Sequence, residues 1–363
     1  MKRVLIITSH RKDRAPNQRF RFEQYLPFLE KNGFQFDFSP LFSESDDKLL
    51  YTPGHLSAKL WIGFKAACLR LVNVLKRNEY DIIFIAREGF ITGTTFFESL
   101  LRKSKAKIIY DFDDAIWHFD VSKANKRMGW LKNPGKTAKL ISFADLVFAG
   151  NNYLADYAKH HADHVVIVPT TIDTDEYCPV NITEKPKVCI GWSGSYTTIR
   201  HFEMIVPALK KIKQKFGDQI YFKVIGDGNF INDDLGIQGI PWSKEDELME
   251  LSEIDIGIMP LPDDEWSKGK CGLKGLQYMA LNIATIMSPV GVNSEIIEEG
   301  INGFLAGSEL EWVEKLSVLI TNKDLRKQLG AVGRKTVVDK YSVNANKPLY
   351  IHYFNMLTKP GKS

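Results

Sequence analysis

The chain has 363 residues, 44% of them hydrophobic and 25% charged, which is enough for two or three domains with sizeable cores. Its net charge of +4 is too small to indicate a nucleic-acid-binding protein. The four cysteines show neither metal-ligand spacing nor a disulfide framework, and no apolar run approaches the ~20 residues that span a bilayer. Because the first apolar run is also too short for a signal peptide, we expect a cytoplasmic protein.

The first half of the chain alternates short apolar segments with segments of helical period. We predict strands at 4–8, 34–38, 81–86, 107–111, 146–149 and 165–168. Helices are predicted at 19–32, 56–77, 94–103 and 151–160, and a further helix is predicted to end at residue 144. This alternation predicts a doubly wound parallel α/β domain over residues 1–172. Residues 169–186 are rich in turn formers and lack periodicity, which indicates a linker.

The helix predicted at 56–77 carries five basic residues and no acid. At the helical period its basic residues fall within an arc of about 140°, and its large apolar residues face the other way. Two arrangements fit this pattern. The apolar face packs on the sheet with the basic face in solvent, which we favour, or the helix lies on an anionic membrane. Peripheral membrane contact through residues 56–77 is therefore the alternative expectation.

The second half repeats the same scheme over residues 187–340. Strands are predicted at 187–192, 221–225, 254–259 and 283–287, and helices at 201–216, 244–252, 309–320 and 325–340. A further helix precedes the strand at 283–287. Its apolar face is formed by residues at three- and four-residue spacing, namely Leu273, Leu276, Met279 and Ala280.

A second face of that helix is polar. Lys270, Lys274 and Gln277 share it, and two ammonium groups one turn apart at a helix start make a plausible diphosphate seat. The strand at 283–287 is ended by Ser288-Pro289-Val290-Gly291, as expected of a buried parallel strand. We therefore predict a phosphorylated ligand at the carboxyl edge of the second sheet.

This segment resembles the donor-site signature of GT-B glycosyltransferases of the large retaining family four, the glycosyl transferases group 1. The matching residues are Gly272-Leu273, Leu276, Met279-Ala280, the strand that follows, and Val290-Gly291 with Ser294-Glu295. The glutamate that holds the donor ribose in this family falls on Gln277. A subset of such enzymes carries a similar lysine pattern in place of the family's glutamate pair.

The resemblance implies two Rossmann-like domains facing a cleft. Residues 1–172 would form the acceptor side and residues 187–340 the nucleotide-sugar donor domain. Residues 341–363, which include Tyr350, Tyr353 and Phe354, would form a last helix that crosses back to the first domain. No metal and no cofactor other than the nucleotide-diphosphate sugar co-substrate is implied.

Three further features of the second half fit a donor site. Gly194 and Ser195 follow the first strand in a Gly/Ser turn that can wrap a phosphate, although such turns are also common without ligands. By position this turn resembles the family's donor-phosphate loop. The arginine and lysine that are usual in that loop are absent from the turn, and Arg200 would supply one positive charge in their place. Trp242 either stacks on the nucleobase or packs between helices.

In the first half, polar residues follow strands at the edge where a ligand would bind. Asp113, Asp114 and His118 come after the strand at 107–111, where carboxylates either accept sugar hydroxyls or order the loop. Glu88 follows the strand at 81–86. Arg19 and Arg21 resemble a basic element that binds an anionic acceptor or a donor phosphate, or they pair locally.

We therefore expect a retaining hexosyltransferase-type enzyme that moves a sugar from a nucleotide-diphosphate sugar to a glycan or lipid-linked acceptor, in cell-surface polysaccharide or glycoconjugate assembly. Asp113, Asp114, His118, Lys270 and Lys274 are the candidate catalytic residues. Two alternatives are a catalytically silent nucleotide-sugar-binding protein and a GT-B nucleotide-sugar epimerase. The expected location is the cytoplasm, with the inner face of the cell membrane as a second site.

Overall fold

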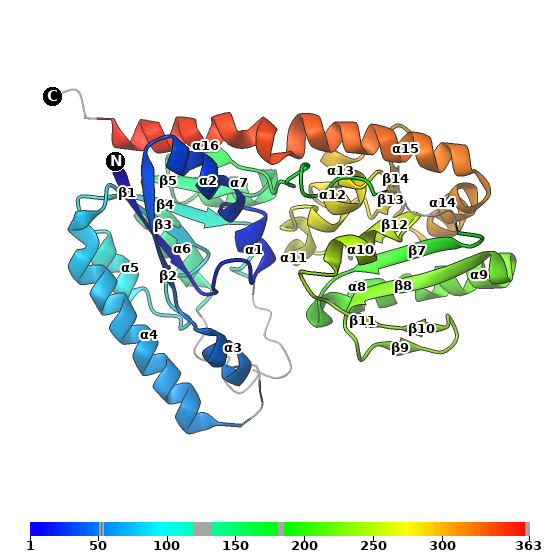
Figure 1. The fold of residues 1–363 in the computed structure, drawn as a ribbon. Coiled ribbons are helices and arrows are strands. Elements are labelled where there is room, and N and C mark those ends of the chain that lie inside the picture. Colours follow the sequence, from blue (N-terminus) through cyan, green and yellow to red (C-terminus); the bar gives the residue numbers. More distant parts are fainter. Residues whose placement is uncertain (51, 53, 119–132, 181–184, 360–363) are drawn as a thin grey trace. The chain divides into compact units, whose positions relative to one another are not determined.

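The computed structural model describes residues 1–50, 52, 54–118, 133–180 and 185–359. The chain divides into two compact units, which are Met1–Thr170 with Lys347–Ser363 (unit 1) and Thr171–Asn346 (unit 2) (Figure 1). Most of the segment predicted as a linker thus belongs to unit 2. There Tyr177 is fully buried, and the Ile172 amide donates a hydrogen bond to the Tyr341 carbonyl.

Unit 1 contains a six-stranded parallel sheet in the order β2-β1-β3-β4-β5-β6. The strands are β1 (Lys2–Thr8), β2 (Phe34–Pro40), β3 (Ile82–Ala86), β4 (Lys107–Phe112), β5 (Leu146–Ala149) and β6 (Val165–Ile167). Their central residues are buried on both faces, as in parallel sheets covered by helices on each side. The predicted doubly wound arrangement is confirmed, and its switch point lies between β1 and β3.

The helices of unit 1 differ in detail from those predicted. They are α1 (Pro16–Arg19), η1 (Glu23–Tyr25), α2 (Leu26–Lys31), α3 (Glu44–Leu50), α4 (Leu56–Lys76), η2 (Arg77–Glu79), α5 (Phe96–Leu101), α6 (Gly135–Phe143) and α7 (Asn152–Lys159). The single helix predicted at 19–32 is broken, because Pro27 suits the first turn of α2 but not a helix interior. Helix α3 was missed because its charged sequence lacks apolar periodicity.

Helix α4 packs with the face opposite to the one predicted. Its buried residues are Ile62, Ala66, Arg70, Asn73 and Val74, whereas its large apolar residues are exposed. Arg70 is fully buried and donates hydrogen bonds to the carbonyls of Thr8, Ser39 and Gly89. Small residues on this side let the helix approach the sheet, and the guanidinium satisfies carbonyls at strand ends. The favoured arrangement, with the apolar face inside, is therefore wrong.

Unit 2 contains a second six-stranded parallel sheet, in the order β11-β8-β7-β12-β13-β14. The strands are β7 (Val188–Ser193), β8 (Ile220–Gly226), β11 (Ile240–Pro241), β12 (Ile256–Met259), β13 (Ala284–Met287) and β14 (Phe304–Leu305), and a separate hairpin pairs β9 (Ile231–Asn232) with β10 (Ile237–Gln238). In chain order this is the dinucleotide-fold order 3-2-1-4-5-6. Its switch point lies between β7 and β12.

The helices of unit 2 surround this sheet. They are η4 (Tyr196–Thr198), α8 (Ile199–Glu203), α9 (Val206–Phe216), η5 (Gly217–Gln219), α10 (Glu247–Ser252), α11 (Glu265–Lys268), α12 (Leu273–Ala280), α13 (Asn293–Ile296), α14 (Glu309–Thr321), α15 (Lys323–Thr336) and the π-helical turn η6 (Val337–Tyr341). The helix predicted at 201–216 is split, because Pro207 begins α9. None of the helices in the described residues is long and apolar enough to cross a membrane.

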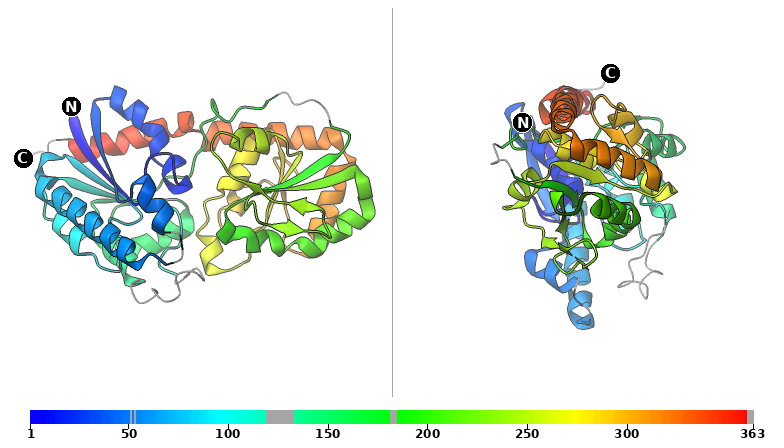
Figure 2. Two further views of the ribbon diagram at one scale, coloured as in Figure 1. Left: turned by 60° about the horizontal axis from the view of Figure 1, so that its bottom comes forward. Right: turned by 90° about the vertical axis from the view of Figure 1, so that its right-hand side faces the viewer.

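Helix α16 (Val343–Thr358) begins in unit 2 and continues in unit 1. Within unit 1 it lies beside α2 (Figures 1 and 2). The Tyr350 ring stacks on Tyr25 with 3.9 Å between ring centres, and Phe354 meets the edge of Phe34 at 5.3 Å. These aromatic contacts attach the end of the chain to the first β-α-β segment of unit 1.

Candidate functional site

The turn that follows β7 lies at the switch point of the unit 2 sheet. Strand β7 is flanked by β8 and β12, and the chain leaves it at Ser193 to form η4 and α8. In open parallel sheets, ligands bind outside the carboxyl ends of the strands at such a point. Residues 194–198 are therefore the centre of the candidate site.

Gly194 allows Lys274 to lie over this turn. The Lys274 ammonium is 4.6 Å from the centre of the Trp192 ring and 3.5 Å from the Thr198 hydroxyl. A Cβ atom at Gly194 would overlap the Trp192 ring and lie 2.9 Å from the Lys274 nitrogen. The structure thus brings together two elements that the sequence placed 80 residues apart, a small-residue turn and a cation.

Gly226, at the end of β8, supports the same turn. Its φ is +128°, which L side chains rarely adopt, and a Cβ atom there would overlap the carbonyl oxygen of Gly194. The Gly194 amide in turn donates a hydrogen bond of 2.9 Å to the Ile225 carbonyl. The end of β8 and the turn after β7 therefore meet through backbone atoms alone.

We expect Gly226→Ala to lower the free energy of unfolding by more than the ~1–3 kcal/mol that backbone strain alone costs, because the new methyl group would also displace Gly194. Gly236→Ala is the matched control, since Gly236 has φ +68° but no atom within 4 Å of its Cβ position. Urea unfolding of both variants measures the difference. Equal losses would show that the contact with Gly194 contributes nothing.

The two amides expected to bind phosphate are already engaged. The Gly194 amide donates to Ile225, and the Ser195 amide donates to the Thr198 hydroxyl at 3.0 Å. The hypothesis that these amide groups face a ligand is therefore wrong. The next amides, at Tyr196 and Thr197, open a helical turn, and the first amides of a helix have no acceptor within it. These two residues, which belong to the same predicted phosphate loop, are the better donors.

Lys270 does not lie on the helix that carries Lys274. Helix α12 begins at Leu273, after Gly272 with φ +71°, and the Lys270 amide closes a turn at the end of α11 by donating to Ser267. The predicted shared helical face of Lys270 and Lys274 is therefore wrong. The Lys270 ammonium lies 5.1 Å from the centre of the Trp266 ring.

His201 marks the point where the cations converge. Its side chain is 1% exposed, and neither ring nitrogen makes a hydrogen bond in the structure. Burial, together with the charges of Lys274, Arg200 and Lys270, lowers the pKa of His201 to about 4, against the opposing charge of Asp264. Sequence reasoning missed this histidine because a single His in an amphipathic segment carries no signal.

The low pKa of His201 predicts an acid-sensitive fold. Between pH ~6.5, its ordinary pKa, and its folded pKa of about 4, the unfolded chain binds more protons, so stability falls as the pH falls. We expect His201→Leu to lose less melting temperature than the native chain between pH 7 and pH 4.5. The exposed His160→Leu serves as the control. An unchanged pH profile in His201→Leu would contradict this assignment.

Gln277 is buried in a hydrogen-bond network instead of facing the turn. Its amide nitrogen donates to the Tyr177 hydroxyl at 3.3 Å and to the Glu247 carboxylate at 3.2 Å. The Trp242 indole donates to the same carboxylate at 3.0 Å, and the Tyr177 hydroxyl donates to it at 2.7 Å. Glu247 and Tyr177 accept the hydrogen bonds of the Gln277 amide nitrogen, and the predicted role of Gln277 in substrate binding stays a prediction.

Trp242 is held by the same carboxylate. The half-buried indole follows β11, and its nitrogen points at Glu247. This bond fixes the orientation of the ring and leaves both of its interpretations, stacking and packing, open. Sequence reasoning missed Glu247 and Tyr177, because they lie 30 and 100 residues before Gln277 in the chain, respectively.

Unit 1 places a second polar group at the carboxyl edge of its sheet. Arg87 follows β3 and holds both predicted carboxylates, with Nε 2.7 Å from Asp113 and Nη2 2.6 Å from Asp114. Its φ of +59° is rare for a non-glycine residue, and its backbone is held by Asp111 and the Tyr110 hydroxyl. Burial lowers the pKa of Arg87, but Asp113 and Asp114 outweigh this and raise it above its ordinary value.

Arg21 has a structural role. Its guanidinium is fully buried and pairs with Asp111 at 2.5 Å, and it also donates to the Val168 carbonyl. Burial raises the pKa of Asp111, and the charge of Arg21 opposes that rise. The expected role of Arg21 in binding substrate is therefore wrong, because the carboxylate at the end of β4 needs a buried cation. Arg19 is also buried, with its guanidinium 4.9 Å from the Phe20 ring centre.

The remaining candidates of unit 1 lie near this edge. The His118 ring is 3.2 Å from the Tyr153 hydroxyl, and Trp117 stacks on Tyr157 with 3.7 Å between ring centres. Glu88 is partly exposed, with its carboxylate 3.8 Å from the Lys136 ammonium.

Arg200, on α8 of unit 2, is exposed. Within the described residues, no group of three or more His, Cys, Asp or Glu side chains could hold a metal ion.

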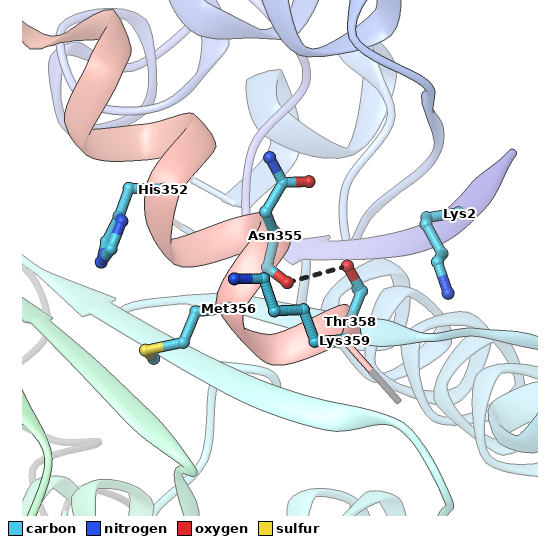
Figure 3. A pocket seen from close by; sticks show the side chains of 6 residues that line it. All are labelled: Lys2, His352, Asn355, Met356, Thr358 and Lys359. Carbon is cyan, nitrogen blue, oxygen red and sulfur yellow. Dashed lines mark hydrogen bonds between the residues drawn. The ribbon is translucent and has the colours of Figure 1, made fainter. Parts of the chain in front are cut away.

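A surface pocket in unit 1 lies away from this edge. It is lined by Lys2, His352, Asn355, Met356, Thr358 and Lys359 (Figure 3). Lys2 is the first residue of β1, so the pocket is at the amino edge of the sheet, whereas Arg87 and Asp113 are at the carboxyl edge. The pocket therefore plays no part in the candidate site.

Residues 187–322, which contain the turn after β7 and Lys274, match the model of a protein family described as glycosyl transferases group 1. The matched domain is therefore similar to glycosyl transferases group 1. This domain is the part of unit 2 that carries the dinucleotide-fold sheet, which confirms the resemblance noted in the sequence. A comparison with curated proteins by sequence finds no match.

Solved structures extend the likeness of the glycosyltransferase domain to the whole chain. A glycosyltransferase from Rickettsia africae ESF-5 is 15% identical with a TM-score of 0.69, each chain being 99% covered. Anabaena Alr3699/HepE in complex with UDP-glucose is 14% identical with a TM-score of 0.67, covering 98% of this chain and 100% of that one. The lipopolysaccharide outer core galactosyltransferase WaaB is 15% identical with a TM-score of 0.61, covering 98% and 99%. The chain thus has the GT-B glycosyltransferase fold.

Proposed function

We propose that the chain transfers a hexose, with retention, from a nucleotide-diphosphate sugar to a glycan or lipid-linked acceptor in cell-surface polysaccharide or glycoconjugate assembly. Unit 2 would bind the donor, with residues 187–340 as the donor domain. Unit 1 would bind the acceptor, with residues 1–172 as the acceptor domain, and residues 341–363 would be the last helix. The observation that carries the proposal is the Lys274 ammonium held over the Gly194 turn at the switch point.

The donor diphosphate fits this turn chemically. When the bond between the sugar and the phosphate breaks, the leaving nucleoside diphosphate gains negative charge, and a preorganised cation stabilises it. Lys274 would supply that cation on the turn, and Lys270 and Arg200 would add charge nearby, since all three depress the pKa of His201. The amides of Tyr196 and Thr197 would donate to the phosphate oxygens.

The acceptor would bind at the carboxyl edge of the unit 1 sheet. Sugars are polyols, and Asp113 and Asp114 retain acceptor capacity for hydroxyl groups while the ion pairs with Arg87 hold both carboxylates in place. Glu88 and His118 lie at the same edge, after β3 and β4. We infer a role in acceptor or sugar binding for these four residues.

Retention would follow from transfer on one face of the sugar. The acceptor oxygen forms a bond to the anomeric carbon as the carbon–oxygen bond to the diphosphate breaks. The bonding electron pair leaves with the diphosphate, and a phosphate oxygen takes the proton of the acceptor hydroxyl. The protein would contribute orientation, exclusion of water and electrostatic stabilisation.

A panel of nucleotide sugars tests this proposal against its two alternatives. A transferase releases nucleoside diphosphate faster when a suitable acceptor is present, whereas a silent protein binds without release and an epimerase isomerises the donor with no acceptor. Nucleoside diphosphate release with and without acceptor oligosaccharides, together with analysis of the sugar nucleotide, separates the three. Acceptor-independent epimerisation or complete lack of turnover would contradict sugar transfer.

The proposed place of action is the cytoplasm, including the inner face of the cell membrane, where lipid-linked acceptors are met. Residues 56–77 are the proposed membrane-contacting segment. Fractionation of cells that produce the native chain tests this location.

A further inference from the structure

His10 lies at the switch point of the unit 1 sheet. It follows β1 by two residues, and Arg87 follows the neighbouring strand β3 by one. The charge of Arg87 acts on the His10 ring, and Arg87 in turn pairs with Asp113, so the histidine and this ion pair share one edge of the sheet. In open parallel sheets, ligands bind at this edge.

One buried side chain clamps the backbone of His10. Gln18 is 1% exposed, accepts a hydrogen bond from the His10 amide at 3.2 Å and donates one to the His10 carbonyl at 3.0 Å. The Thr8 hydroxyl donates to the same carbonyl at 2.9 Å. Both backbone polar groups of His10 are thus satisfied within the protein, and the base of its side chain is held in place.

A carboxylate of α3 holds the ring of His10. Its Nδ1 lies 3.3 Å from Oδ1 of Asp47, whose side chain is 6% exposed. The other oxygen of this carboxylate, Oδ2, accepts a hydrogen bond from Nε of Arg14 at 3.2 Å. Because a carboxylate can only accept hydrogen bonds, Nδ1 must carry the hydrogen of the neutral ring. The lone pair of neutral His10 is therefore on Nε2.

The surroundings of His10 favour the neutral ring. Burial lowers the pKa of His10, and the charges of Arg14 and Arg87 lower it as well, against the opposing charge and hydrogen bond of Asp47. The side chain is 22% exposed, and among the described residues none donates a hydrogen bond to its Nε2. His10 therefore offers one fixed hydrogen-bond acceptor at the edge where Asp113 and Asp114 lie.

We propose that Nε2 of His10 accepts a hydrogen bond from a hydroxyl group of the acceptor sugar, other than the hydroxyl that is glycosylated, and that Asp47 is the positioning residue that fixes the tautomer. A lone pair selects a donor, so a hydroxyl group fits it and a carboxylate or phosphate oxygen does not. Such a contact discriminates against sugars that lack the hydroxyl. The inference rests on the proposed transfer to a sugar acceptor.

The tautomer of His10 can be measured without any substrate. In the full chain labelled with ¹⁵N-histidine, with His10 assigned by its loss in His10→Phe, we expect a hydrogen on Nδ1 and none on Nε2 at neutral pH. In Asp47→Asn, Arg14 still requires the side-chain oxygen, so the new amide nitrogen would face Nδ1 and move the hydrogen to Nε2. Asp46→Asn is the matched control, because Asp46 is also buried on α3 but pairs with Lys65.

Two results of this measurement would overturn the proposal. One is a native ring that carries its hydrogen on Nε2. The other is a tautomer that Asp47→Asn leaves unchanged, since Asp47 would then only attach α3 to the sheet.

Sugar binding measures the contact itself. The full chain and its variants are titrated with a panel of disaccharides, without donor, and binding is followed by ligand-observed NMR. The dissociation constant of the disaccharide that binds most tightly should rise by about fivefold to tenfold in His10→Phe and in Asp47→Asn, as for one lost hydrogen bond. It should stay native in Asp46→Asn.

Deoxy analogues of that disaccharide identify the hydroxyl group on the native protein. One analogue should bind the native chain as weakly as the parent sugar binds His10→Phe, and for this analogue His10→Phe should cost nothing more. Native affinity in His10→Phe, or no binding of any disaccharide by the native chain, would overturn the proposal.

Failure of this inference differs from failure of sugar transfer. Sugar binding that depends on His10, without release of nucleoside diphosphate from any donor, would reject transfer and keep the contact. Acceptor-dependent release with the same KM for the acceptor in His10→Phe as in the native chain would reject the contact and keep transfer.

Discussion

Replacing Lys274 with alanine is expected to lower kcat/KM for the nucleotide-sugar donor by about 100-fold, as the loss of one preorganised charge-stabilising group does in other active sites. The ammonium lies 4.6 Å from the Trp192 ring centre, over a turn that only glycine at position 194 leaves open. Its stabilisation is felt most when the leaving diphosphate carries full charge. The loss should therefore appear in kcat as well as in KM.

The control for Lys274→Ala is an exposed lysine of the same unit on another helix. Lys335 is exposed on α15 and pairs only locally, with Asp339. Lys335→Ala should retain native kcat/KM and melting temperature. Lys274→Arg should recover part of the rate, since it keeps the charge with a different shape. Native kcat/KM in Lys274→Ala would remove Lys274 from the donor site.

Arg21→Met is expected to destabilise the fold by about 4 kcal/mol, because removing one partner of a buried ion pair leaves an uncompensated charge. Both side chains of the pair with Asp111 are almost inaccessible, at 0% and 2% exposure. A loss of this size is a large part of the 5–15 kcal/mol by which domains are ordinarily stable. Chemical denaturation at pH 7 measures it.

The pH dependence and a double variant separate this cause from simple loss of packing. Without Arg21, the pKa of Asp111 in the folded chain should rise further above its pKa in the unfolded chain. The folded state of Arg21→Met then binds a proton at Asp111 more readily than the unfolded state, so the stability lost in this variant should decrease as the pH falls. Arg21→Met/Asp111→Leu should be more stable than Arg21→Met alone. Additive losses and a pH-independent deficit would show that the pair carries no coupling energy.

The sheets were predictable because their signal is local. Each buried strand, such as β3 with Ile82 and Ile85, is a short apolar run, and each is followed by turn residues or a helical pattern. The parallel arrangement followed from the alternation of the two patterns, since parallel strands need crossover helices. The breaks at Pro27 and Pro207 show the limit of this signal, as periodicity continues across a proline that the helix cannot.

The packed side of α4 was not predictable from its pattern. A hydrophobic stripe ordinarily faces the core, and here Arg70 reverses the choice by bonding to carbonyls of three distant segments. The amphipathic pattern shows that two faces differ. It does not show which face has a partner, because this depends on backbone groups that only the folded sheet brings together.

The donor site was partly predictable for a similar reason. The Gly194 turn and Lys274 can each be recognised from the local sequence, and the structure places them close together. The surroundings of Gln277 depend on Glu247 and Tyr177, whose positions follow from the fold and not from spacing. Likewise, the engaged amide of Ser195 becomes visible only once Thr198 folds back on it.

Calorimetric titration of nucleotides into the full chain tests the central claim most directly. If the diphosphate lies on the Gly194 turn and Lys274, nucleoside diphosphates should bind at least tenfold more tightly than the matching monophosphates. This preference should vanish in Lys274→Ala and persist in Lys335→Ala. A diphosphate preference that is unchanged in Lys274→Ala would contradict the proposed donor site.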